Sequence, residues 1–196
     1  MEYEITRSRR KTLSMQIKNG RVVIRAPLRT TNAEIRQFVE KHRQWLEKHM
    51  MQSQALEQAK AGLRRLTKAE IAELKKKARK VIPERVAFWA PKIGVTYGRI
   101  SIRCQKTRWG SCSSKGNLNF NCLLMLTPDG VIDSIVVHEL CHRKVMNHSA
   151  KFYAEMEKVL PEYRQHRKWL KEHGEMILAM CEGAEDGPED ASAQVL

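Results

Sequence analysis

The chain has 196 residues, of which 36 are Lys or Arg and 22 are Asp or Glu, so its formal net charge is +14. No apolar run is long enough to cross a bilayer and the first residues are charged, so we expect no membrane span, no signal peptide and a cytoplasmic protein. The length predicts one domain over residues 1–181, followed by a disordered acidic tail at 182–196.

The first thirty residues predict strands. Residues 12–17 alternate in polarity, residues 21–27 form a second extended run, and Asn19-Gly20 between them is typical of a hairpin turn. A basic cluster at residues 7–11 lies on or before the first strand of this hairpin.

Two long helices are expected next. Thr31 or Asn32 should cap the first, whose helical composition continues through residue 56 until Gly62 marks a break. Thr67 starts a capping box for the second, which should run to about residue 89. Pro83 inside it predicts a kink or a join between helices. One face of the second helix should pack on the sheet through Ile71, Leu74, Ala78, Val81 and Ile82.

Residues 96–104 predict another strand, and residues 117–122 alternate strictly in polarity. In the later strand Leu118, Phe120 and Cys122 should face the core, which leaves the three asparagines on the opposite face. A loop joins the two strands at residues 105–116.

His138-Glu139-Leu140-Cys141-His142 is the most informative stretch. The apolar residues 131–137 before it predict a buried helix that starts at Pro128 or Asp129. Because residues four apart lie on one helix face, His138 and His142 can bind the same metal ion. Glu139 stands beside them, where its carboxylate can take a proton from a metal-activated water molecule.

His148 is the candidate third ligand. The helix must end between His142 and His148 for the chain to return to the metal, and Asn147 suits a left-handed turn there. Ser149 then suits the N-cap of a new helix. Three histidines leave a fourth position open, as in catalytic zinc sites, although nickel, cobalt or iron also suit them. The competing third ligands are Glu155, Glu157 and His166.

After Pro161 a last helix is expected from residue 163 to residue 180. The cysteines form no CxxC pair and are odd in number, so we expect reduced thiols rather than a disulfide framework. They are Cys104, Cys112, Cys122, Cys141 and Cys181.

These motifs, in this order along the chain, resemble the bacterial YgjP-like metallopeptidase family, which is similar to SprT-like and other zincin domains. The resemblance covers nearly everything except the acidic tail. It implies a zincin-like core with a small antiparallel sheet beside the metal helix, zinc bound by His138, His142 and His148, and Glu139 as the base. With the additional long helices, we expect an α+β fold. The matching segments are 9–12, 25–27, 108–112, 117–121 and 138–149.

The first functional hypothesis is a zinc peptidase. A substrate strand would pair with a sheet edge near residues 117–121, where Asn119 and Asn121 are candidate substrate contacts. Arg108 or Arg143 would stabilise the developing negative charge, and the sequence does not choose between them.

Two other hypotheses rest on positive charge. A metal-dependent nucleoside triphosphate pyrophosphatase or phosphohydrolase would use cations near the motif, including Lys106, and Trp109 would stack on a base. A nucleic-acid-binding protein with a structural metal would use the basic residues 75–80 and 7–11. We rank the peptidase first and the nucleotide hydrolase second.

Overall fold

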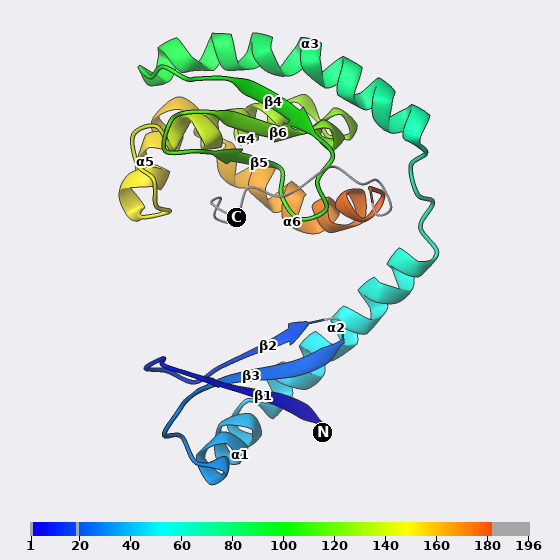
Figure 1. Ribbon diagram of the computed structural model, residues 1–196, viewed down its shortest axis with the longest axis vertical. Helices are drawn as coiled ribbons and strands as arrows, with labels where there is room; N and C mark the ends of the chain where they lie inside the picture. The colour runs from blue at the N-terminus through cyan, green and yellow to red at the C-terminus, as the bar shows by residue number, and fades with distance from the viewer. Residues whose placement is uncertain (1, 19, 182–196) are drawn as a thin grey trace. The chain divides into compact units, whose positions relative to one another are not determined.

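The structure is a computed structural model that describes residues 2–18 and 20–181. The chain forms two compact units, one up to Leu63 and one from Arg64 onward, and each contains a three-stranded sheet (Figure 1). Helices and small sheets occur in both units, so the expected α+β class is confirmed. The acidic tail at 182–196 and Asn19 of the expected turn lie outside the described residues.

The first unit is built on a mixed sheet with the order β1-β3-β2. Its strands are β1 (Tyr3–Ser8), β2 (Ser14–Lys18) and β3 (Arg21–Pro27). The antiparallel pairing of β2 with β3 confirms the predicted hairpin strands. β1 pairs parallel to β3, which the sequence did not predict. Alternate residues of β3, namely Val22, Ile24 and Ala26, are buried, as expected for a sheet covered on one face.

Two helices cover this sheet, α1 (Asn32–Lys41) and α2 (Arg43–Ala61). The predicted cap is confirmed, because Thr31 accepts a bond from the Glu34 amide at 3.2 Å and its own amide donates to the Glu34 carboxylate at 2.7 Å. One helix was expected, but the chain breaks at His42, whose φ of −111° and ψ of 18° lie outside the helical range. Ile35 and Leu46 complete a core of five buried residues with those of β3.

The second unit begins with α3 (Lys68–Ile93), one helix of 26 residues. The predicted capping box of Thr67 with Glu70 is confirmed. Pro83 lies inside this helix without dividing it, and the helix ends at Gly94, whose φ of 74° suits glycine. The predicted apolar face of α3 is packed in the core, as expected. It contacts the sheet, but its main partners are α4 (Asp129–Cys141) and the 3₁₀ helix η1 (Cys122–Leu126).

The second sheet is mixed, whereas the resemblance implied an antiparallel one. Its strands are β4 (Ile100–Arg103), β5 (Gly110–Cys112) and β6 (Leu118–Asn121), in the order β4-β6-β5. β4 runs parallel to β6, and β5 runs antiparallel to it. Because β6 is paired on both sides, the expected substrate edge at residues 117–121 is wrong, and the edges of this sheet are β4 and β5.

Helix α4 lies at the centre of the second unit and packs against α3, β5 and the two last helices, α5 (Ala150–Val159) and α6 (Tyr163–Ala179) (Figure 1). Its predicted start at Asp129 is confirmed, and nearly every residue from Val131 to Cys141 is buried. No helix among the described residues is long and apolar enough to span a membrane.

Candidate metal centre

Three histidine side chains converge at the end of α4. The Nε2 atom of His138 lies 3.2 Å from that of His142 and 3.0 Å from that of His148. Around a tetrahedral ion with zinc–nitrogen bonds of about 2.0–2.1 Å, ligand nitrogens are roughly 3.3 Å apart. The ligand atoms of all three residues lie within 4.8 Å of one another, so the cluster fits a single metal ion.

The chain between α4 and α5 brings the third histidine to the other two. α4 ends at Cys141, the backbone turns through a bond from the Val145 amide to the Cys141 carbonyl, and Ser149 begins α5. The Nδ1 atom of His142 lies 3.2 Å from the Val145 carbonyl oxygen. An N–H at Nδ1 that donates to this oxygen leaves the Nε2 lone pair for a metal.

The alternative third ligands are occupied elsewhere. The Glu155 carboxylate pairs with Lys144 at 3.0 Å and with Lys158 at 2.6 Å, and Glu157 pairs with Arg164 at 3.3 Å. His166 lies against Gly130. Within residues 2–18 and 20–181, the three histidines are the only cluster of this type.

Phe152 forms an apolar wall for the cluster and was missed by the sequence reasoning. Its ring centroid lies 4.8, 4.6 and 5.0 Å from those of His138, His142 and His148, and its side chain is fully buried. The one sequence feature that indicates this role is the spacing of four residues between His148 and Phe152. Packing against one rigid ring restricts the three imidazoles to orientations in which their Nε2 atoms meet.

Burial keeps the histidines neutral. It lowers the pKa of His138 to about 2, with further contributions from the neighbouring imidazoles and Arg167. Burial also lowers the pKa values of His142 and His148. Because only a neutral imidazole can bind a metal, these shifts favour the binding form at neutral pH.

Glu139 is buried on the same helix, with 2% of its surface exposed. Burial raises the pKa of its carboxyl to about 8, and the positive charge of Arg108 opposes this shift. Gly110 of β5 lies against the carboxylate, and a Cβ atom there would be 2.7 Å from Oε1. The absence of a side chain at Gly110 therefore makes room for a carboxyl group that can hold or release a proton.

Arg143 and Arg108 have different surroundings. Arg143 donates from Nε to the Thr96 carbonyl at 3.1 Å and from Nη1 to the Ser114 carbonyl at 3.2 Å, so it braces two loops. Arg108 is half-buried, its Nε has no hydrogen-bond partner among the described residues, and its charge acts on Glu139. Of the two candidates, Arg108 is the one left available to a reacting group. Lys106, two residues earlier, is exposed.

The other candidate substrate contacts have structural roles. Trp109 is 7% exposed and packs in the core near Gly174 of α6, so its ring offers no open face to a base. Asn121 is fully buried and donates from Nδ2 to the carbonyls of Gln105 at 2.7 Å and Arg108 at 2.9 Å. Asn119 is half-buried and donates to the Ser111 hydroxyl at 3.3 Å.

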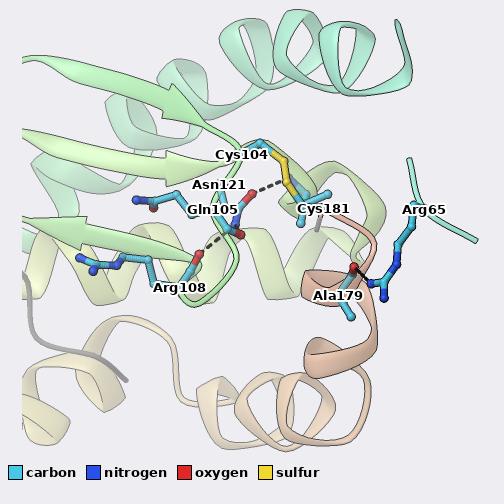
Figure 2. The surroundings of a disulfide bond; sticks show 8 residues. Arg65, Cys104, Gln105, Arg108, Asn121, Ala179 and Cys181 are labelled. Atoms are coloured by element: carbon cyan, nitrogen blue, oxygen red, sulfur yellow. Dashed lines mark hydrogen bonds between the residues drawn. A yellow bond between two sulfur atoms is a disulfide. The ribbon is translucent and has the colours of Figure 1, made fainter. Parts of the chain in front are cut away.

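A disulfide joins Cys104, just after β4, to Cys181, just after α6 (Figure 2). The expectation that all cysteines are reduced is wrong for this pair, because residues 77 positions apart in sequence have Cα atoms only 6.6 Å apart. Cys112, Cys122 and Cys141 lie outside this disulfide, as expected of reduced thiols, and all three are buried. The disulfide fixes the start of the loop that carries Arg108, and Asn121 fixes its middle (Figure 2).

Arg167 of α6 is a second residue that the sequence reasoning missed. Its charge lowers the pKa values of both His138 and His148, after burial and, for His138, after the other two histidines. It lies far from the metal motif in sequence among the polar residues of an amphipathic helix, where a cation is ordinary. No local pattern distinguishes it from its neighbours.

These features describe a cluster of three histidines that could hold a metal ion, with a buried carboxyl group next to His138 in the sequence. A family model described as the YgjP-like metallopeptidase domain matches residues 11–73 and 54–173. The chain therefore belongs to the YgjP-like metallopeptidase domain family, which confirms the resemblance seen in its motifs.

Two solved structures are similar to part of the chain. They are the metallopeptidase zymogens of Pyrococcus abyssi abylysin and Methanocaldococcus jannaschii jannalysin. Each is 22% identical with a TM-score of 0.43, and each match covers 47% of this chain and 94% or 96% of the respective neighbour. The search of curated proteins found no match.

Proposed function

We propose that this protein is a zinc-dependent peptidase in which His138, His142 and His148 hold the metal and Glu139 is the general base. The observation that carries the proposal is the convergence of three Nε2 atoms beside a buried carboxyl group of the same helix. Membership in a metallopeptidase family supports the same reaction class. Three imidazoles with room for a fourth ligand are typical of catalytic zinc.

A zinc ion held by these histidines would supply Lewis acidity to a water molecule and to the substrate carbonyl. Glu139 takes the proton of the attacking water and passes it to the leaving amine, as expected of a general base held next to the metal ligands. Arg108 acts on this carboxylate and stabilises negative charge that develops beside it.

The peptide substrate would bind along β5. This strand is an edge of its sheet and packs against α4, which carries the base. An extended peptide can add to an edge strand through backbone hydrogen bonds, which requires no particular side chain. The short strand Gly110–Cys112 replaces β6 as the expected pairing partner.

A nucleotide substrate has less support. The ring expected to stack on a base is in the core, and Arg143 and Lys144 already bind other protein groups. Nucleic-acid binding through the exposed lysines of α3 and a cytoplasmic location remain predictions.

The decisive experiment compares zinc-loaded wild type with Glu139→Gln. Each protein is incubated with an unfolded protein and with a peptide library, and the products are identified by mass spectrometry. A nucleotide panel is assayed for phosphate release in parallel. Wild type should cleave peptides, and Glu139→Gln should reduce the rate at least about 100-fold, as expected for loss of a general base.

Glu157→Gln is the matched control, because Glu157 is an exposed acid on α5 outside the histidine cluster. This variant should keep wild-type activity. Peptides left intact by metal-loaded wild type, or cleaved equally by Glu139→Gln, would contradict the proposal. Phosphate release that depends on Glu139 would favour the nucleotide hydrolase.

A further inference from the structure

Besides Arg108, the cations near the metal centre differ in what they bind. Arg143 is bonded to two backbone carbonyls, and Lys144 is paired with Glu155. Arg167 is exposed, and among residues 2–18 and 20–181 it has no carboxylate partner. Arg167 therefore keeps its charge and its hydrogen-bond donors available to a ligand from solvent.

Aromatic rings hold Arg167 near the third histidine. Its Cζ lies 5.4 Å from the ring centroid of Tyr153. The Tyr153 ring is in turn 6.4 Å from that of His148, at an interplanar angle of 30°, and 6.2 Å from that of Tyr163. A guanidinium over an aromatic face is attracted to the ring quadrupole, which restricts where the planar group can lie.

This placement has an electrostatic consequence. Arg167 lies over the Tyr153 ring, which stacks beside His148, so its charge would repel a metal cation held by the histidines. No carboxylate of the described residues offsets this repulsion by pairing with Arg167. An anion held beside both the guanidinium and the metal would offset it. A carboxylate suits the site best, because its two oxygens match the fork of guanidinium donors.

We propose that Arg167 binds a carboxylate of the peptide substrate, so that the enzyme selects peptides with an acidic group on the His148 side of the scissile bond. The inference rests on the proposed peptidase function. The carboxylate comes either from an Asp or Glu side chain or from the free C-terminus of the peptide.

Small metal-binding probes test the site without any known substrate. Monohydroxamates of succinic, glutaric and adipic acid carry a free carboxylate at increasing distance from the metal-binding group. Each is compared with its neutral primary amide by calorimetry on zinc-loaded protein. At the best length, wild type should bind the acid about 10-fold more tightly than the amide, as a charge-assisted bond predicts.

Arg167→Ala should remove this preference, and Arg167→Lys should retain part of it, since lysine keeps the charge without the fork. Arg164→Ala is the matched control, because Arg164 lies one turn earlier on α6 and pairs with Glu157 at 3.3 Å. Equal binding of acid and amide by wild type, or a preference that survives in Arg167→Ala, would overturn the inference. Failure of wild type to bind any hydroxamate would overturn the proposed metal centre and the inference with it.

Matched peptides distinguish the two sources of the carboxylate. One pair exchanges Glu for Gln, and the other exchanges a free C-terminus for an amide. Arg167→Ala should raise KM about 10-fold for the acid member of one pair and leave kcat nearly unchanged. An equal fall in kcat for acid and neutral peptides would assign Arg167 to the developing oxyanion instead and would contradict carboxylate selection.

Discussion

The two units of the molecule differ in the chemical nature of what they bury. Among its described residues, the first unit buries five side chains, and all of them are apolar. In the second unit the core also contains polar and ionisable side chains. In the sequence, all of them come from the segment that begins with β5 and ends at the C-cap of α4. They are Ser111, Asn121, Ser134, His138, Glu139 and His142.

This difference indicates where the chemistry is located. A buried polar group costs free energy unless it is bonded, and a buried ionisable group costs more. The first unit contains no such group among its described residues, so its interior is explained by packing alone. In the second unit His138, Glu139 and His142 lie together on the last turn of α4 and its C-cap, and buried ionisable groups gathered in this way are expected of a functional site and not of a core selected for stability.

The largest contrast should come from two glycine substitutions. Gly110→Ala puts a methyl group 2.7 Å from the Glu139 carboxylate, so the base must move and peptidase activity should fall about 100-fold. Gly62→Ala in the first unit meets nothing closer than 4.0 Å at a helical φ of −85° and should stabilise its unit by about 0.4–1 kcal/mol. Peptidase activity and thermal unfolding are measured for both variants. Full activity in Gly110→Ala would show that Glu139 tolerates displacement.

Two fully buried leucines provide a second contrast. Leu46→Ala and Leu140→Ala should each cost about 2–5 kcal/mol of unfolding free energy, because each leaves a cavity. Leu140 lies on α4 between two ligands, so its replacement should also weaken zinc binding. Leu46→Ala should leave zinc affinity unchanged. Denaturant unfolding and zinc titration measure the two effects, and a loss of zinc affinity in Leu46→Ala would show that the units are coupled.

The disulfide should stabilise only the second unit. Cys181→Ser should lower the unfolding free energy by about 2–4 kcal/mol, a typical value for a native disulfide that closes a long loop. Denatured, unreduced protein should react with three equivalents of a thiol reagent, one for each cysteine outside the disulfide, and reduced protein with five. Five equivalents without reduction would show that Cys104 and Cys181 are thiols.

The two capping boxes allow a finer test. Thr31→Ala in the first unit and Thr67→Ala in the second should each cost about 1 kcal/mol, because each leaves an amide of the first helical turn unbonded. If the units unfold separately, each substitution should shift only its own transition in a calorimetric scan. A single transition shifted equally by both would indicate one cooperative unit.

The smallest effect should be a pH dependence from the same boxes. Hydrogen bonds from the Thr67 backbone amide, the Arg64 side chain and the Thr67 hydroxyl lower the pKa of Glu70 to about 2. Bonds from the backbone and side chain of Thr31 lower the pKa of Glu34 in the same way. Their contributions are present above the ordinary pKa of 4.5 and are lost as pH falls towards the lowered values. Glu70→Gln should therefore flatten the acid side of the stability curve, and an unchanged slope would assign acid sensitivity to other groups.

Local signals in the sequence were sufficient for most of the elements. Thr31 and Thr67 fixed two helix starts, and the spacing of His138 and His142 placed two candidate ligands on one helix face. These features depend on residues within a few positions of one another. The break at His42 was missed because the apolar pattern of the two helices runs through it.

Features that depend on distant residues were not predictable in the same way. The parallel pairing of β1 with β3 joins strands separated in the sequence by β2, and no local pattern specifies it. The disulfide and the approach of Arg167 to His148 arise only once α6 has packed in the second unit. Asn121 was expected on a polar face, but its bonds to the loop carbonyls allow it to be buried.

The most direct test of the metal centre is the zinc content and affinity of the purified protein. Wild type should bind one zinc ion per chain, measured by plasma mass spectrometry and by competition with a chelating dye. His148→Ala should weaken binding at least about 10-fold, since removing a direct ligand should cost at least as much as removing its supporting contacts. His173→Ala, an exposed histidine of α6 bonded to the Trp169 carbonyl, should bind like wild type. Unchanged affinity in His148→Ala would contradict a three-histidine centre.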